Sequence, residues 1–275
     1  MPSVSRAAVV THGVTMNVDQ AVSRLRALAE SAGVELLFDA DEAAKHGLEP
    51  SERADPELAV VLGGDGTMLR ALARYLDSGV PVVGANFGRV GFLATIPGDE
   101  LESGLGRIFA GDYTVLSLPT LEVSLDGSRH VAVNDAVVVS GIPGRIIEIA
   151  YSIGGENLGT HPCDGLICAT PPGSTAYNLS NGGPVLVWGL DAAVVTFVAP
   201  HTLHARPLVV GPDLELVVSN RTPDVDAVVL VDGHRVAVLP PAATVTVRFG
   251  GSRTQLATLP EQTFFGRYSQ VFGAG

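Results

Sequence analysis

The sequence predicts an N-terminal α/β domain followed by a β-rich domain. Two observations lead to this fold class. Apolar runs of strand length alternate with helical spacing over residues 1–116, whereas short strands separated by turn dipeptides fill residues 117–250. The 275 residues are enough to give each of the two domains its own hydrophobic core.

The first region alternates strands with helices. Four apolar runs predict strands, at residues 7–10, 34–38, 58–62 and 80–85. Apolar residues recur at helical spacing over residues 19–32, 68–76 and 99–110. This order of elements indicates a parallel, Rossmann-like sheet that is covered by helices.

The pattern of apolar and turn residues changes after residue 116. Turn dipeptides punctuate the chain, at Asp126-Gly127, Gly154-Gly155, Gly182-Gly183 and Asp232-Gly233. Helical spacing almost vanishes there, so residues 117–250 are expected to form a second, all-β domain. A tail, residues 251–275, carries aromatic side chains that need a surface to pack against.

Charge and composition limit the class of partner. A formal net charge of -12 argues against a nucleic-acid partner, because nucleic-acid binding needs a basic surface. The absence of a long uncharged apolar stretch predicts a cytoplasmic protein with no membrane partner. Cys163 and Cys168 are expected to be plain buried thiols. Since Lys45 is the only lysine, any phosphate must be met by arginines, backbone amides or a metal.

The loop Gly63-Gly64-Asp65-Gly66-Thr67 joins an apolar run to a helix, where doubly wound folds bind ligands. Its glycines let backbone amides approach phosphate oxygens, and the helix start behind them favours anions. Asp65 suits this loop if its carboxylate takes a proton from a hydroxyl or holds Mg²⁺. The alternative is a tight turn in which Asp65 caps the helix.

A second Gly-rich stretch runs from Thr170 to Pro184 and combines hydroxyls, an aromatic ring and turn residues. Tyr177 can stack on a base or a nicotinamide ring, and Thr175 and Ser180 offer hydroxyls nearby. An ordinary Ω-type loop has a similar composition and remains the alternative.

Two further polar positions interrupt apolar runs. Asn134-Asp135 divides what reads as one continuous strand, and such a polar pair is costly unless it is bonded. It could recognise an adenine edge and a ribose hydroxyl, or it could be a β-bulge. Asn86 lies at the carboxyl end of the strand that begins at Val80, either at the ligand edge of the sheet or as a turn former.

These blocks, in this order, resemble NAD kinases. The match consists of Gly63-Gly64-Asp65-Gly66-Thr67, Asn134-Asp135, the stretch from Asp164-Gly165 to Pro184, and Pro200-His201-Thr202-Leu203-His204-Ala205-Arg206-Pro207. The first block alone is shared with diacylglycerol, sphingosine and phosphofructokinase-type enzymes. Only the later blocks distinguish the NAD kinase family from them.

The resemblance implies a fold and an activity. Residues 117–250 would form a β-sandwich, the tail 251–275 would return to the first domain, and NAD would bind between the domains of a homodimer or homotetramer. The reaction would phosphorylate the 2′-hydroxyl of the adenosine ribose of NAD to give NADP. ATP or polyphosphate would be the donor, assisted by Mg²⁺ or another divalent cation, and no protein metal ligand is assigned.

The resemblance also implies roles for residues. Asp65 would accept the proton, and Arg70 would face the phosphates. Arg145 would reach the NAD from its own or a neighbouring subunit. The phosphate loop would be Gly63, Gly64, Gly66 and Thr67. The expected substrate-binding residues are Asp65, Gly66, Arg70, Asn86, Phe87, Asn134, Asp135, Arg145, Asp164, Thr175, Ala176, Tyr177, Asn178, Leu179, Ser180 and His234.

The sequence departs from the family pattern at three places. Pro162 stands where relatives often have Arg or Lys, and Pro172 replaces a small hydroxyl residue. The C-terminus also lacks the usual Lys-Leu-Gly-Trp-like ending. The two prolines are the only support for a rival reading, a catalytically impaired NAD(P)-binding regulator of the same fold. A lipid or sphingoid kinase would need an exposed apolar groove, for which the sequence shows no stretch.

Overall fold

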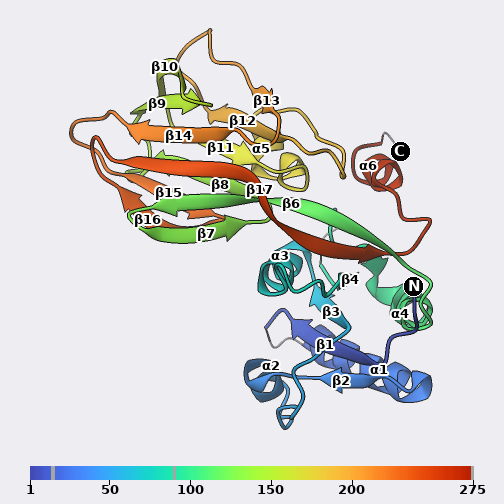
Figure 1. Ribbon diagram of the computed structural model, residues 1–275. Helices are drawn as coiled ribbons and strands as arrows, with labels where there is room; N and C mark the ends of the chain where they lie inside the picture. The colour runs from blue at the N-terminus through green and yellow to red at the C-terminus, as the bar shows by residue number, and fades with distance from the viewer. Residues whose placement is uncertain (14–15, 89–90, 274–275) are drawn as a thin grey trace. The chain divides into compact units, whose positions relative to one another are not determined.

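The computed structural model describes residues 1–13, 16–88 and 91–273 of the chain (Figure 1). The chain divides into two compact units. Unit 1 consists of Met1–Ser117 and Thr254–Gly275, and unit 2 is Leu118–Arg253. Both limits fall inside long strands, β6 (Thr114–Leu125) and β17 (Thr244–Thr258), so two strand segments connect the units covalently.

Unit 1 is built on a parallel sheet with the strand order β2-β1-β3-β4. The bounds of its strands are β1 (Arg6–Thr11), β2 (Glu35–Leu37), β3 (Leu58–Gly63), β4 (Val82–Asn86) and β5 (Ile96–Pro97). The short strand β5 and the end of β17 also pair with β4 in parallel. The predicted α/β domain with a parallel sheet is thereby confirmed.

Helices cover this sheet. They are α1 (Met16–Ala32), α2 (Ala40–Lys45), α3 (Asp65–Arg74) and α4 (Leu101–Phe109). The 3-10 turn η1 (Gly98–Glu100) precedes α4, and the C-terminal helix α6 (Phe264–Phe272) contacts Phe92 and Ala94. Every residue of β3 is buried, as expected for a parallel strand covered on both faces. The core of unit 1 joins apolar residues of α1 and α4, such as Leu25 and Ile108, to Val60 of β3.

Helix α2 is absent from the sequence prediction because it is only six residues long, too short to show a helical repeat. Its start is fixed by Asp39, whose side chain accepts the backbone N–H of Glu42. As a result, Glu42 lies buried in unit 1, where an acidic side chain needs partners.

Unit 2 is an antiparallel sandwich, as predicted. One sheet has the order β10-β9-β14-β17 and also includes β6 and β7, and the other has the order β13-β12-β11-β8-β15-β16. The bounds are β7 (Ser128–Ala132), β8 (Asp135–Ser140), β9 (Ile147–Ile153), β10 (Glu156–Cys163), β11 (Gly165–Ala169), β12 (Ala193–Val198), β13 (Leu208–Val210), β14 (Glu215–Asn220), β15 (Ala227–Val231) and β16 (His234–Leu239).

The two sheets of unit 2 share one hydrophobic core. Ile149 and Val218 contribute from the first sheet, and Val138, Leu166 and Val195 contribute from the second. Neighbouring residues on the second sheet form a separate apolar cluster on its other face, with Leu186 packed against Val137, Ile167, Ala169 and Val194. The alternation of strand side chains therefore gives this sheet two buried faces.

The apolar run around Asn134-Asp135 is not one strand, so that prediction is wrong. Strand β7 ends at Ala132 and pairs with β6, whereas β8 begins at Asp135 and pairs with β11 and β15 in the other sheet. Residues 133 and 134 carry the chain from one sheet to the other. An apolar run alone cannot show this change, because both segments alternate in the same way.

Cys163 and Cys168 are buried and unpaired, which confirms their prediction as plain thiols. Burial raises the pKa of each thiol to about 12, so neither is a reactive thiolate. In the described part of the chain, no helix combines the length and the apolar character needed to cross a membrane.

Candidate active site

The Gly-rich loop of unit 1 places Asp65 at the first position of α3. The residue that caps this helix is Gly64, which has no side chain, so Asp65 is not the cap. Its carboxylate instead accepts three backbone N–H groups from a distant loop. Phe92 donates to Oδ2 at 2.7 Å, and Leu93 and Ala94 both donate to Oδ1 at 3.0 Å. The capping alternative is therefore wrong.

We call residues 91–95 the amide cradle of Asp65. A carboxylate offers about four lone-pair sites, and the cradle occupies three of them, which leaves one on Oδ2. Gly91 closes the cradle so tightly that a Cβ atom there would lie 2.4 Å from the Asp65 carboxyl group. Asp65 remains partly exposed, so the remaining site on Oδ2 can meet a substrate hydroxyl.

The glycines of this loop have different surroundings. A Cβ atom on Gly63 would lie 2.5 Å from the Thr67 hydroxyl, so Gly63 is needed for packing. Gly64 and Gly66 face open space, with no heavy atom within 4 Å of an added Cβ. Backbone amides beside such open space, at the start of a helix, can bind phosphate oxygens.

Two predicted residues of β4 and the following turn adjoin this loop. Asn86 is the register partner of Gly63, and the N–H of Phe87 donates to the Gly63 carbonyl at 3.3 Å. The Asn86 side chain accepts the N–H of Gly88 at 2.8 Å, which is the bond of a turn former. The structure thus brings Gly63, Asn86 and Phe87 together at one edge of the sheet.

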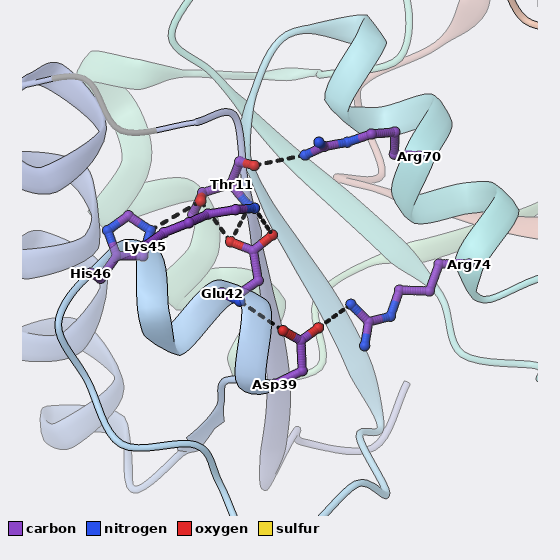
Figure 2. A network of polar contacts seen from close by, with 7 residues as sticks. All are labelled: Thr11, Asp39, Glu42, Lys45, His46, Arg70 and Arg74. Atoms are coloured by element: carbon purple, nitrogen blue, oxygen red, sulfur yellow. Dashed lines mark hydrogen bonds and ion pairs between the residues drawn. The ribbon is translucent and has the colours of Figure 1, made fainter. Parts of the chain in front are cut away.

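Arg70 belongs to a polar network at the end of β1, shown in Figure 2. Its Nη2 donates to the carbonyl of Thr11 at 2.7 Å, while its side chain stays exposed. The buried Glu42 carboxylate accepts the Thr11 N–H at 3.2 Å and the Thr11 hydroxyl at 2.7 Å. It also accepts the Lys45 ammonium at 2.7 Å. The single lysine therefore neutralises a buried carboxylate, whereas Arg70 is exposed and its recorded partner in this network is a carbonyl rather than a carboxylate.

In unit 2, the turn at Asn134-Asp135 is held by Asp232, a residue that the sequence analysis singled out only as part of a turn dipeptide. The Asp232 carboxylate accepts the backbone N–H groups of Val133 at 2.9 Å, Asn134 at 2.7 Å and Asp135 at 3.1 Å. In the sequence, the Asp-Gly dipeptide of the β15–β16 hairpin was the signal that could have pointed to Asp232. The distance of almost one hundred residues along the chain hid its partner.

This turn has unusual electrostatics. Asp135 is buried, and its pKa is raised to about 7 by burial and, in addition, by the negative charge of Asp232. The Asn134 side-chain oxygen is buried without a hydrogen-bond partner in the structure. A buried acceptor of this kind is costly unless a ligand donates to it.

The second Gly-rich stretch folds into the turn η2 (Gly173–Thr175) and the short helix α5 (Tyr177–Ser180). Asn178 is fully buried and bonded inside the protein. Its amide donates to the carbonyls of Ser174 and Pro184, and its oxygen accepts the Thr196 hydroxyl at 2.7 Å. Asn178 therefore holds the loop together, and it presents no surface to a substrate in this conformation.

The other five predicted residues of this loop are accessible. They are Thr175, Ala176, Tyr177, Leu179 and Ser180. The Tyr177 side chain is 39% exposed, so it is not part of the hydrophobic core. The buried bonds of Asn178 thus fix the inner side of the loop, while the predicted contact residues form its accessible side.

The remaining predicted residues are more scattered. Nδ1 of His234 lies 3.0 Å from the carbonyl oxygen of Asp232, the residue whose carboxylate holds the Asn134-Asp135 turn. Asp164 lies 4.0 Å from the ring of His201. Arg145 is exposed and pairs with the exposed carboxylate of Asp224 at 3.0 Å, and no recorded contact connects it to the other predicted residues.

The two halves of the sequence match two domain families, described as the ATP-NAD kinase N-terminal domain, over residues 2–113, and the ATP-NAD kinase C-terminal domain, over residues 133–259. An NAD kinase of Gemmatimonas aurantiaca is 33% identical and covers 98% of this chain and 96% of that protein. One from Heliobacterium modesticaldum is 41% identical over 76% of both chains.

Solved structures give the same result. An NAD kinase from Archaeoglobus fulgidus, crystallised in complex with ATP, has a TM-score of 0.77 and 26% identity, and the match covers 98% of this chain and 100% of that one. Yeast NADH kinase complexed with NADH has a TM-score of 0.86 at 20% identity, covering 98% of this chain and 88% of that one, and this likeness concerns the fold.

Proposed function

The chain belongs to the NAD kinase family, and we propose that Asp65 is the general base with which it phosphorylates the 2′-hydroxyl of the adenosine ribose of NAD. The observation that carries this proposal is the amide cradle. It fixes the Asp65 carboxylate and leaves one acceptor site on Oδ2.

In the proposed reaction, the ribose hydroxyl gives its proton to Oδ2 of Asp65. The ribose oxygen then forms a bond to the γ-phosphorus of the donor as the bond to the leaving diphosphate breaks. Phosphoryl transfer needs little covalent chemistry from the protein, so catalysis consists of positioning and charge neutralisation. The backbone amides at Gly64 and Gly66, which border open space, would bind the triphosphate together with Arg70.

A divalent cation such as Mg²⁺ is part of this proposal. Within the residues that the structure describes, no group of three or more His, Cys, Asp or Glu side chains could hold a metal ion. A Mg²⁺ ion commonly keeps several waters and binds through substrate phosphates with one or two carboxylates. The site fits that mode, with the ion held mainly by the donor phosphates and water, where it would neutralise phosphate charge.

Residues of unit 2 are proposed to bind NAD. The unpartnered oxygen of Asn134 can accept a donor from the adenine or the ribose. Because its pKa is about 7, Asp135 can hold a proton at neutral pH and donate it in a hydrogen bond to a ribose oxygen. Tyr177 would stack on a ring, with Thr175 and Ser180 beside it.

Arg145 is proposed to contact NAD as well. This requires its ion pair with Asp224 to open. Both side chains are more than half exposed, and exposed ion pairs contribute little to stability, so exchanging Asp224 for a phosphate is feasible. We expect Arg145→Ala mainly to weaken NAD binding, and Arg70→Ala mainly to weaken triphosphate binding.

We also propose that the protein is a cytoplasmic homodimer or homotetramer. The two free cysteines fit a reducing compartment. The edge strand β13 exposes Leu208 and Val209, and such an edge favours association with another chain. Light scattering coupled to size exclusion measures the oligomeric state directly.

The test of function is product formation by the purified protein with NAD, Mg²⁺ and a panel of donors that includes ATP, other nucleoside triphosphates and polyphosphate. We expect NADP, with the new phosphate on the adenosine ribose as identified by mass spectrometry and phosphorus NMR. Tight NAD binding without product for any donor would contradict the proposal and favour the impaired regulator.

A further inference from the structure

We propose that Arg267, in the C-terminal helix α6, is a positioning residue for the Asp65 carboxylate and acts by fixing the amide cradle. This inference rests on the proposed role of Asp65 as the general base. All of its contacts lie within unit 1.

Arg267 contacts the cradle at Ala94. The Ala94 N–H donates to Oδ1 of Asp65 at 3.0 Å, and the Ala94 carbonyl accepts Nη2 of Arg267 at 2.9 Å. Ala94 is fully buried, so its carbonyl needs a partner inside the protein. The same residue therefore connects Asp65, on its amide side, with Arg267, on its carbonyl side.

A second side chain of the C-terminal segment holds the next carbonyl. Nε2 of Gln262 donates to the Thr95 carbonyl at 2.8 Å. Gln262 is itself fixed, because its N–H donates to the Leu259 carbonyl at 2.9 Å. Two consecutive carbonyls of the cradle, at Ala94 and Thr95, are thus bonded to residues beyond β17.

The other end of the cradle is held by aromatic packing. Phe92, whose N–H donates to Oδ2 of Asp65, is buried against Phe264 and Phe272, with ring centroids 6.0 Å and 5.6 Å away. Helix α6 begins at a Thr263 cap that accepts the Gly266 N–H at 3.1 Å. This start places Phe264 and Arg267 one turn apart or less, on the side that meets the cradle.

Arg267 is also a partly buried cation close to the candidate base. Burial lowers the pKa of its guanidinium, and the negative charge of Asp65 acts in the opposite direction. Its guanidinium donates to the Ala94 carbonyl and to the Gln270 side chain. Within the described residues, Arg267 has no recorded ion pair with a carboxylate. Its positive charge lies close to the Asp65 carboxylate.

The first experiment separates turnover from substrate affinity. We expect Arg267→Gln to lower kcat about 10- to 100-fold, because a small displacement of a catalytic group has this effect. The KM values for NAD and the triphosphate should change less than about threefold. Arg107→Gln is the matched control, because Arg107 binds Glu261 of the same C-terminal segment but contacts no cradle residue. Its kcat should stay within about twofold of wild type.

The second experiment is a double-mutant cycle with Asp65→Asn. If Arg267 acts through the Asp65 carboxylate, adding Arg267→Gln to Asp65→Asn should lower the residual rate by less than about twofold. An Arg267→Gln effect as large in this background as in wild type would overturn the inference. A raised KM for the triphosphate at normal kcat would also overturn it, since Arg267 would then be a ligand-binding cation.

Gln262→Met provides an independent variant in case Arg267→Gln does not fold. It should lower kcat about three- to tenfold at near-constant KM, and an unchanged kcat would overturn the inference. Failure of the proposed function has a different signature. In that case Asp65→Asn itself keeps normal turnover, whereas failure of the positioning role leaves Asp65→Asn inactive and the Arg267 and Gln262 variants fully active.

Discussion

Asp65 in unit 1 and Asp232 in unit 2 have the same bonding pattern in different surroundings. Each carboxylate accepts three consecutive backbone N–H groups, from residues 92–94 in one case and from 133–135 in the other. In both, one oxygen accepts two of the bonds and the other oxygen accepts one. The two carboxylates therefore share one hydrogen-bonding pattern.

The surroundings give the two carboxylates different tasks. Asp65 begins a helix and lies close to the Arg267 cation, so its free acceptor site is available to a substrate. Asp232 lies in a hairpin turn at a φ of 47°, and burial raises its pKa. Its charge acts on the neighbouring Asp135 and raises the pKa of that side chain. Three backbone N–H groups bonded to one carboxylate can thus present a base or fix a binding turn.

The comparison is tested most strongly by Asp65→Asn. We expect kcat to fall about 10³-fold, the range of a lost general base. In addition, the NH₂ group of the Asn side chain faces one of the backbone N–H groups of the cradle, and because it is itself a donor it cannot accept that hydrogen bond. A coupled NADP assay at saturating substrates measures the loss, with circular dichroism to verify folding. Near-normal turnover of the folded variant would show that Asp65 has no catalytic task.

Asp232→Asn should instead affect stability and NAD binding. One of the three N–H groups of residues 133–135 loses its acceptor, so the free energy of unfolding should fall by about 1–3 kcal/mol. The KM for NAD should rise about tenfold, because the Asn134-Asp135 turn loosens, while kcat stays within about threefold. Urea unfolding and steady-state kinetics measure both effects. A loss of kcat as large as that of Asp65→Asn would show that Asp65 and Asp232 do not differ in task.

The raised pKa of Asp135 makes the stability of the protein depend on pH. Its pKa is about 7 in the native protein against an ordinary value of 3.8, so the native state retains a proton that the unfolded state releases. The proton that Asp135 retains therefore stabilises the native state fully below pH 4. This stabilisation decreases as the pH rises towards 7, and it is absent well above pH 7. Asp135→Asn removes the decrease. The variant should gain about 2 kcal/mol relative to wild type between pH 5 and pH 7.

Urea unfolding of the wild type and Asp135→Asn at several pH values tests this prediction. Parallel stability profiles would mean that Asp135 is ionised throughout the range, and that the charge of Asp232 has no effect on it. Asp224→Asn is a suitable control, because Asp224 is exposed and should leave the profile unchanged.

The smallest expected effect concerns Tyr177, on the accessible side of the unit 2 loop. Tyr177→Ala should raise the KM for NAD about five- to tenfold, the loss of about 1 kcal/mol of stacking. Thermal stability should change less, because the side chain is already 39% exposed. Leu190→Ala, which removes a 46% exposed side chain from the same unit, is the control. Equal effects of both substitutions on KM would place NAD elsewhere.

The sequence by itself determined the architecture and the family. The alternation of apolar runs with helical spacing predicted the parallel sheet of unit 1, and turn dipeptides predicted the all-β unit 2. The order of four motifs identified the family, which the comparisons confirm. These properties depend on local residue patterns or on the order of the motifs, and both can be read directly from the sequence.

Only the tertiary structure decided how the candidate site is held. The donors to Asp65 are backbone amides 27 to 29 residues away, and those to Asp232 are 97 to 99 residues away. Since every residue except proline carries the same backbone N–H group, the sequence does not indicate which residues will donate to a given carboxylate. The burial of Asn178, the bond between Arg267 and Ala94 and the raised pKa of Asp135 depend on neighbours distant in sequence. Burial and charge are properties of position in space, and a sequence pattern records neither.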